Sequence, residues 1–209
     1  MDILQELSTF MQQGRVPKVK ELTQQALDEG IPAAKILEEG LLSGMSVVGE
    51  KFKNNQVFVP EVLIAARAMN AGTEILKPYL AQSGVKETGT VVLGTVKGDL
   101  HDIGKNLVKM MMEGKGLKVI DLGVDVPAEK FISSAKENDA DIIACSTLLT
   151  TTMHEMKNVV ELVKESGLDV KTMIGGAPVT ESFRESIGAD SYTPDAASAA
   201  DVAAAFCKA

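Results

Sequence analysis

Apolar residues recur at steps of three and four along about the first eighty positions, the pattern of amphipathic helices. Gly14 and Pro17 separate the first two helices, and Pro32 and Pro60 begin the third and fourth. The expected core positions of the third helix are Leu37, Leu41, Met45, Val48 and Phe52. Because the connections are short and no strand pattern interrupts them, we predict a four-helix bundle.

The third predicted helix contains three glycines, Gly40, Gly44 and Gly49. Each glycine inside a helix costs about 1 kcal/mol relative to alanine. Their spacing therefore predicts that another backbone comes very close to this helix.

The period changes from residue 89 onward. The apolar runs VVLGTV, KVIDLGV, DIIACST and VKTMIGG recur at intervals of about 25 residues, with helical stretches between them. Continuous apolar runs are typical of parallel strands that are covered on both faces. We predict an α/β domain with a doubly wound, five-stranded parallel sheet of the Rossmann-like or flavodoxin-like kind, its last strand near Ser191. The expected domains are residues 1–82 and 90–209, joined by a linker at 83–89.

Composition narrows the classes of partner. The 209-residue chain has a formal net charge of -8 and no cluster of Lys and Arg, which argues against binding nucleic acid. The first residues resemble neither a signal peptide nor a transit peptide, and no window is apolar enough to span a membrane. Cys145 and Cys207 lack metal-ligand spacing. We expect a reduced, cytoplasmic protein with no membrane partner.

The candidate chemistry lies in GTVKGDLHDIGKNLV, residues 94–108, between the first predicted strand and its helix. Ligands of such folds bind at the carboxyl ends of the strands. The glycine spacing fits neither a dinucleotide fingerprint nor a P-loop. Asp99, His101 and Asp102 could ligate a hydrolytic metal together with His154, although the chain has only two histidines. A third interpretation is a histidine that merely forms hydrogen bonds within a polar loop.

The same residues resemble a known family. The stretch DLHDIG, residues 99–104, resembles the D-x-H-x-x-G signature of cobalamin-binding domains. After the third predicted strand, residues 146–148 resemble the family's S-x-L motif, and after the fourth, residues 175–176 resemble its G-G motif. The stretch GMSVVGEKFKNNQVFVPEVLIAARAM, residues 44–69, is similar to the helical cap module of methionine synthase and of methyltransferase corrinoid proteins. The resemblance covers nearly the whole chain.

This resemblance implies that cobalamin binds base-off, with its nucleotide tail inside the domain and His101 as the lower axial ligand of cobalt. Asp99 matches the family's carboxylate that bonds to the ligating histidine, and it would fix the tautomer of the imidazole. Thr152 matches a family hydroxyl that continues the hydrogen-bond chain. Thr152 and Glu155 also fit a capping box, so both interpretations stay open.

Further cofactor contacts follow from the resemblance. The residues implied are Gly94, Val96, Asp102, Ile103, Gly104, Ser146, Leu148, Gly175 and Gly176. The glycines would make room for the tail, and Ser146 could donate a hydrogen bond to the benzimidazole. Gly175 and Gly176 could equally form an ordinary turn before Pro178. Above the corrin, the resemblance places Phe58, Val59, Pro60 and Leu63 of the helical part, for which plain bundle core is the alternative.

The implied function is a corrinoid protein that carries a methyl group on cobalt and cycles between methylcobalamin and cob(I)alamin. Its expected partners are a substrate-specific methyltransferase and a second methyltransferase that acts on tetrahydrofolate or coenzyme M. A reductive activator of the corrinoid is a further partner of such systems. The methyl donor could be methanol, a methylamine, a quaternary amine or a methoxylated aromatic.

No substrate-binding barrel of some 250 residues fits into this chain, so we expect a corrinoid subunit rather than a complete methyltransferase. Three alternatives stay open. They are a cobalamin-dependent sensor or regulator, the small subunit of an adenosylcobalamin mutase, and the metal-dependent hydrolase.

Overall fold

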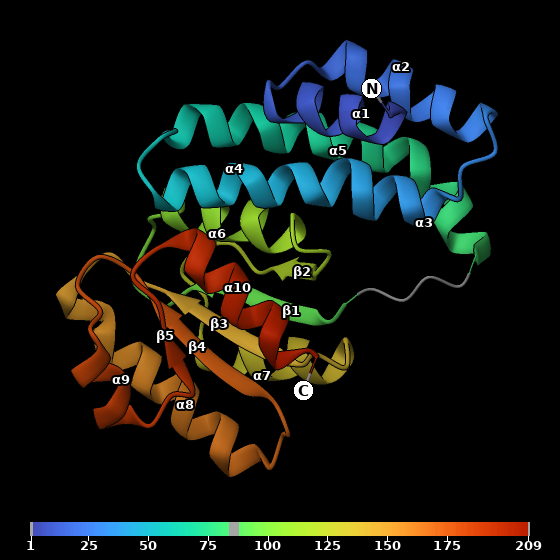
Figure 1. The fold of residues 1–209 in the computed structure, drawn as a ribbon. Coiled ribbons are helices and arrows are strands. Elements are labelled where there is room, and N and C mark those ends of the chain that lie inside the picture. The colour runs from blue at the N-terminus through green and yellow to red at the C-terminus, as the bar shows by residue number, and fades with distance from the viewer. Residues whose placement is uncertain (1, 84–87, 209) are drawn as a thin grey trace. The chain divides into compact units, whose positions relative to one another are not determined.

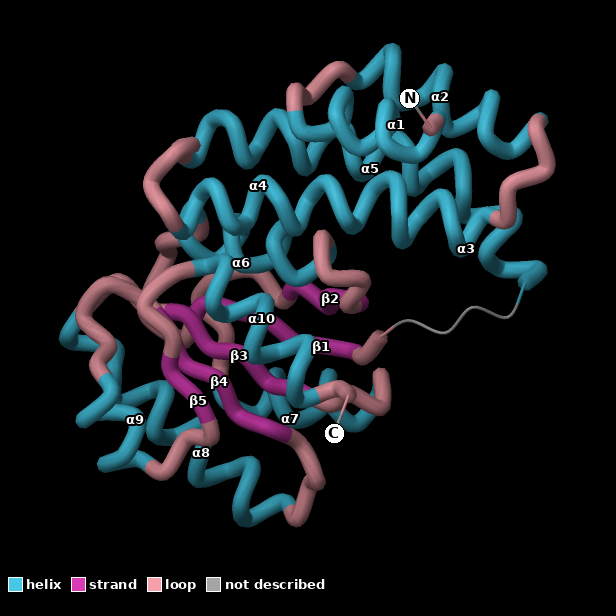
Figure 2. Tube along the Cα trace, viewed as in Figure 1, coloured by secondary structure: helices cyan, strands magenta, loops and turns pink. Residues whose placement is uncertain are grey.

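The computed structural model describes residues 2–83 and 88–208, which form two compact units, Met1–Lys86 and Glu87–Ala209 (Figures 1 and 2). Residues 84–87 of the expected linker lie outside the described part of the chain. Within residues 2–83 and 88–208, no helix is long and apolar enough to cross a membrane.

The first unit is helical, as its apolar periodicity predicts. Its elements are α1 (Ile3–Gln12), α2 (Val16–Asp28), α3 (Ala33–Lys35), η1 (Ile36–Leu42), α4 (Ser43–Lys53) and α5 (Val59–Ser83). α3, η1 and α4 follow one another without a break, so the described part contains four helical rods (Figure 2). Among the core side chains are Leu7, Met11, Val19, Met45 and Met69. The helical-cap part of the predicted fold is confirmed.

The middle of the third rod departs from the predicted register because η1 is a π-helix. A π turn takes more residues than an α turn, so the buried face shifts along the sequence. Ile36 is fully buried, whereas Leu37, which the three-and-four spacing places in the core, is only half-buried.

Gly40 and Gly44 of this rod lie against α1. A Cβ atom on Gly40 would come within 2.6 Å of the Leu7 side chain, and one on Gly44 within 3.0 Å of the Ser8 carbonyl oxygen. The predicted close approach of another backbone is therefore confirmed at Gly44. At Gly40 the space is taken by a side chain instead.

The second unit is the predicted α/β domain. Its strands are β1 (Thr90–Thr95), β2 (Lys118–Asp121), β3 (Ile142–Ser146), β4 (Lys171–Gly175) and β5 (Ser191–Tyr192). Its helices are α6 (Ile103–Glu113), α7 (Ala128–Glu137), η2 (Thr150–Thr152), α8 (Met153–Ser166), α9 (Glu181–Ile187) and α10 (Ala196–Phe206). The strands are all parallel, in the order β2-β1-β3-β4-β5 (Figure 1). The predicted five-stranded parallel sheet is confirmed.

Helices cover both faces of this sheet, which explains why its strands are continuously apolar. α6 and α10 pack against each other on one face (Figure 1). α7 and α8 pack together on the other face, where their core includes Phe131, Met156, Val160, Ile143 and Ile174. With both faces covered, the loops at the carboxyl ends of the strands are where a ligand would meet the sheet.

Candidate functional site

The register of the sheet brings three sequence motifs to one edge. Thr95 at the end of β1 pairs with Ser146 at the end of β3, and Ser146 pairs with Gly175 at the end of β4. The backbone N–H of Thr147 then donates to the carbonyl oxygen of Gly175 at 3.2 Å. The segments that follow these three strands are therefore neighbours, although some 80 residues separate the first from the last.

The centre of this edge is a histidine–carboxylate pair. His101 Nδ1 lies 2.7 Å from Asp99 Oδ1, and the same oxygen accepts the backbone N–H of His101 at 3.0 Å. The Asp99 side chain is fully buried, whereas the His101 side chain is 51% exposed. Because an ionised carboxylate only accepts hydrogen bonds, the neutral imidazole carries its proton on Nδ1 and keeps its lone pair on Nε2.

The second oxygen of Asp99 is held from the segment after β3. Asp99 Oδ2 accepts the Thr147 hydroxyl and the Leu148 backbone N–H, each at 2.7 Å. The Leu149 N–H lies farther away, at 3.4 Å. Four short bonds from three residues thus fix both oxygens of one buried carboxylate.

These donors determine the charge of Asp99. Burial by itself raises the pKa of a carboxyl group. At Asp99 the backbone N–H groups of His101 and Leu148, the Thr147 hydroxyl and the His101 ring outweigh burial and hold the pKa well below its usual range. The group is therefore an anion at neutral pH and an acceptor for the imidazole.

Thr147 is the functional residue that sequence analysis missed. It is the middle residue of the S-x-L stretch, and its polar side chain is 1% exposed. The sequence-predicted hydroxyl, Thr152, is one step removed: its Oγ1 lies 2.6 Å from Thr147 Oγ1 and 3.5 Å from Asp99 Oδ2. A polar residue directly after a buried strand was the available signal.

The capping-box interpretation of Thr152 is wrong. Thr152 is the N-cap residue of α8, but its side chain makes no cap hydrogen bond. Its hydroxyl instead lies 3.1 Å from the Leu149 carbonyl oxygen and within the Thr147–Asp99 network.

The predicted glycines separate into two kinds. A Cβ atom on Gly104 would meet nothing within 4 Å, and one on Gly175 only the Thr193 carbonyl oxygen at 3.9 Å, so both border open space. Gly176 has φ of +135°, and a Cβ atom there would overlap the Thr147 carbonyl oxygen. Gly176 is thus required by the approach of the Thr147 backbone.

Two predicted contacts lie in the core instead. A Cβ atom on Gly94 would come within 2.9 Å of the Phe131 ring, so the space that Gly94 leaves is filled by the protein itself. Val96 is fully buried in the cluster of α7 and α8. Gly94 and Val96 are two residues apart, so both positions face the side of the sheet that α7 and α8 cover. Contact of either residue with the cofactor stays a prediction.

Large apolar side chains around the pair are exposed. Leu100 and Ile103, on either side of His101, are 72% and 76% exposed, and Leu148 and Leu149 are also exposed. Exposed apolar residues gathered at one edge are typical of a binding surface.

The remaining predicted residues of this unit are polar. Asp102 is exposed and accepts a hydrogen bond from the Asn106 side chain at 3.1 Å. Ser146 is half-buried at the end of β3. The backbone before α6 is held as well, because the Thr95 hydroxyl donates to the His101 carbonyl oxygen at 2.8 Å.

In the helical unit, the residues expected to form the cap lie at the start of α5. Phe58 is 64% exposed, Pro60 and Leu63 are exposed, and Val59 is half-buried. Plain bundle core, the alternative interpretation, is therefore wrong for Phe58, Pro60 and Leu63.

The hydrolytic metal site finds no support. No group of three or more His, Cys, Asp or Glu side chains within residues 2–83 and 88–208 could hold a metal ion. His154 is 66% exposed on α8, where its Nε2 lies 3.2 Å from Glu155 Oε1.

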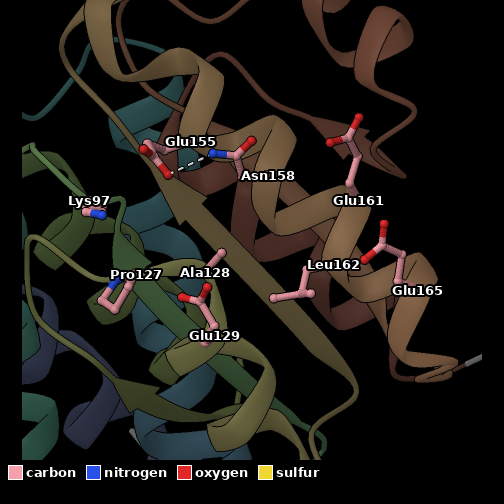
Figure 3. A pocket seen from close by; sticks show the side chains of 9 residues that line it. All are labelled: Lys97, Pro127, Ala128, Glu129, Glu155, Asn158, Glu161, Leu162 and Glu165. Carbon is pink, nitrogen blue, oxygen red and sulfur yellow. Dashed lines mark hydrogen bonds between the residues drawn. The ribbon is translucent and has the colours of Figure 1, made fainter.

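A hollow of about 320 Å³ lies between the start of α7 and the length of α8 (Figure 3). Its lining residues are Lys97, Pro127, Ala128, Glu129, Glu155, Asn158, Glu161, Leu162 and Glu165. Figure 3 shows Glu161 and Glu165 along one helix, well away from Glu129, so these carboxylates do not converge. The hollow does not include the His101 side chain.

The pair offers a metal one nitrogen donor from the protein. A single imidazole suits a metal ion that arrives with its other ligands already in place, as in a macrocycle. The fixed Nδ1 proton, the free lone pair on Nε2, the open space at Gly104 and the exposed apolar side chains all fit a large, partly apolar metal complex.

Comparison with known protein families gives two matches. Residues 89–203 and residues 3–77 each match a family described as "B12 binding domain".

Curated relatives span nearly the same length. A corrinoid protein of Desulfitobacterium hafniense is 42% identical over 208 residues, covering 97% of this chain and 96% of the relative. Trimethylamine corrinoid protein 1 of Methanosarcina acetivorans is 47% identical over 176 residues, covering 82% of each chain. Among solved structures, the methanol:cobalamin methyltransferase complex of Methanosarcina barkeri aligns with a TM-score of 0.89 and 31% identity, covering 99% of this chain and 80% of that chain.

Proposed function

Because the chain belongs to the B12-binding corrinoid proteins, we propose that it is a carrier which takes a methyl group from one methyltransferase and presents it to another. The observation that carries this proposal is the buried Asp99 carboxylate, which holds the proton of His101 on Nδ1. When bound, the corrinoid supplies a cobalt centre that accepts and releases the methyl group.

His101 would ligate cobalt through Nε2, from the lower side of the corrin. Asp99 would keep the imidazole in the tautomer that can ligate and would strengthen it as a donor. When Nε2 is released and takes a proton, the same carboxylate stabilises the imidazolium through a charge-assisted hydrogen bond. The pair can therefore hold or give up one proton at Nε2 as ligation changes.

The open space at Gly104 and Gly175 supports a slot for the nucleotide tail. Ser146, at the adjacent strand end, would donate to the benzimidazole, and Leu148 would form an apolar wall. Phe58, Val59, Pro60 and Leu63 would cover the upper face of the corrin and exclude water from the reacting centre.

The names of the relatives support the identity of the proposed partners. One is named a trimethylamine corrinoid protein, and the aligned structure is a methanol:cobalamin methyltransferase complex. We therefore propose a methylamine or methanol methyltransferase as the donor-side partner. A methyltransferase acting on tetrahydrofolate or coenzyme M would accept the methyl group, and a reductive activator would restore the cofactor.

The test is the identity of the nitrogen that ligates cobalt. The full chain, labelled with 15N-histidine, is reconstituted with cobalamin and reduced to the paramagnetic Co(II) state. Electron paramagnetic resonance should show the hyperfine pattern of 15N, and the His101→Ala variant should lose it. His154→Ala, which removes the other histidine, is the matched control and should retain it. An unlabelled pattern from the cofactor's own base, or no cobalamin uptake at all, would falsify the proposal.

A further inference from the structure

Asp125 lies between β2 and α7 and forms hydrogen bonds with Gly98 and with Asp99, the first residue of the D-x-H stretch. Its Oδ1 accepts the backbone N–H of Gly98 at 2.7 Å. Its own backbone N–H donates to the carbonyl oxygen of Asp99 at 2.9 Å. Asp125 thus holds the backbone on both sides of the peptide bond that joins Gly98 to Asp99.

The backbone on both sides of this contact is unusual. Asp125 has φ of 54°, a left-handed conformation that few residues other than glycine adopt, and Gly98 has φ of +81°. Sparsely populated conformations persist where the surrounding structure holds them. Here a hydrogen bond from the Gly98 N–H to the Asp125 carboxylate joins the two residues with positive φ. Such charge-assisted hydrogen bonds are stronger than neutral ones.

The same segment is also anchored on the far side of His101. Asp121 Oδ1 lies 2.6 Å from Lys105 Nζ and accepts the Gly123 N–H at 2.9 Å. The Lys105 side chain is only 2% exposed. Residues 121–125 are therefore bonded both to the turn before His101 and to the helix after it.

We propose that Asp125 is a positioning residue that holds the Gly98–Asp99 turn so that His101 keeps its proton on Nδ1. The Asp99 carboxylate must reach His101 on one side and the segment after β3 on the other, and such arrangements tolerate displacements of only about 0.5 Å. If the turn relaxes, Nδ1–H loses its acceptor and the tautomer with the proton on Nε2 becomes populated. That tautomer has no lone pair on Nε2, so the importance of Asp125 for cobalt ligation rests on the proposed function.

The test measures the tautomer in the corrinoid-free full chain. Ring 15N chemical shifts of labelled His101, at a pH where the imidazole is neutral, report the ratio of the Nδ1–H form to the Nε2–H form. Asp125→Ala should lower this ratio roughly tenfold. This is the factor expected when the turn relaxes and the charge-assisted hydrogen bond from His101 Nδ1–H to Asp99 is lost. Amide exchange at Gly98 should accelerate in the same variant.

Three further variants separate positioning from general stability. Asp125→Asn keeps an oxygen acceptor and tolerates the left-handed backbone, so it should restore most of the ratio. Asp125→Gly keeps only the backbone freedom, so it should behave as Asp125→Ala does and also serves if the alanine variant fails to fold. Asp139, on the loop after α7, also has a positive φ of 47°, and Asp139→Ala should leave the ratio unchanged.

A wild-type tautomer ratio in Asp125→Gly, with Gly98 exchange accelerated, overturns the assignment, because the bond is then lost without effect on His101. An equal change in Asp139→Ala overturns it too. If the wild-type protein binds no cobalamin, the proposed function fails while the tautomer result still stands.

Discussion

Asp99→Asn changes one oxygen of the buried carboxylate into an NH2 group and tests the whole network. If the NH2 replaces Oδ2, it faces the Thr147 hydroxyl and the Leu148 N–H, two donors now 2.7 Å away. If it replaces Oδ1, the His101 backbone N–H loses its acceptor and Nδ1 can no longer donate. Neither orientation satisfies the site.

The magnitude follows from the bonds that are lost. A hydrogen bond to a charged group contributes about 1.5–3 kcal/mol, and an unsatisfied buried donor costs about 1–3 kcal/mol. Because Thr147 can rotate its hydroxyl away, we expect a loss of about 2–4 kcal/mol in the free energy of unfolding of the second unit. Native-state hydrogen exchange of amides in β1 and β3 measures this unit without requiring two-state unfolding of the whole chain.

The pH dependence of stability tests whether the charge of Asp99 causes this loss. The folded-state pKa of Asp99 is lowered, so its contribution to stability is fully present above the ordinary carboxyl pKa near 4 and falls as the pH drops below it. The asparagine variant lacks this group, so its acid destabilisation should be shallower. Asp102→Asn, the same change at an exposed neighbouring carboxylate, is the control. A stability of Asp99→Asn within about 0.5 kcal/mol of wild type, the usual range for surface substitutions, would refute the argument.

Three other predictions follow from contacts of the second unit. Gly104→Ala should stabilise the corrinoid-free protein by about 0.5–1 kcal/mol, because alanine favours the helix α6 and its Cβ atom meets open space. The same variant should bind cobalamin more weakly in a titration, and an unchanged affinity would contradict a slot for the nucleotide tail at Gly104. Gly176→Ala should cost about 3 kcal/mol or more in the free energy of unfolding, measured by thermal unfolding, because its Cβ atom would overlap the Thr147 backbone. Gly167→Ala, the control with φ of +66° in open space, should cost only about 1–2 kcal/mol. Equal losses would mean that a small shift of the backbone removes the overlap. Asp121→Asn should cost about 3–5 kcal/mol, more than Lys105→Met. It leaves the buried Lys105 ammonium without a charged partner and with only neutral acceptors, among them Asn106 Oδ1 at 2.8 Å, whereas the methionine variant leaves Asp121 3.4 Å from Lys109. Urea unfolding that gives the reverse order would show that Lys105 is not held by this pair.

Local patterns were sufficient for the architecture. The helices of the first unit and the strands of the second follow from apolar periodicity, because each element buries a face of its own. The prediction failed where geometry departs from the standard period. In η1, a π-helix puts Ile36 rather than Leu37 in the core, and nothing in the spacing of apolar residues distinguishes the two.

At the site, sequence motifs identified residues but not the bonds between them. Asp99 and His101 could be paired because they are two residues apart. Thr147 and Asp125 reach Asp99 from 48 and 26 positions away, and only the register of β1, β2 and β3 brings them there. The glycines show the same limit, since Gly94 makes room for Phe131 and Gly104 borders open space. The sequence shows where a glycine leaves space, and only the folded structure shows whether a protein side chain fills that space.

The arrangement explains why a carboxylate rather than a neutral acceptor holds the imidazole. An oxygen of a neutral amide could orient Nδ1–H, but it could not accept the hydroxyl and both backbone N–H groups that meet at Asp99. Burying the charge is costly unless every oxygen is paired, and here donors from two loops pair both. Those donors also keep Asp99 ionised, so it can stabilise a proton on His101 without taking that proton itself. Under the proposed function, in which His101 would bind and release a metal, the Asp99 carboxylate would supply both a fixed tautomer and a lasting counter-charge.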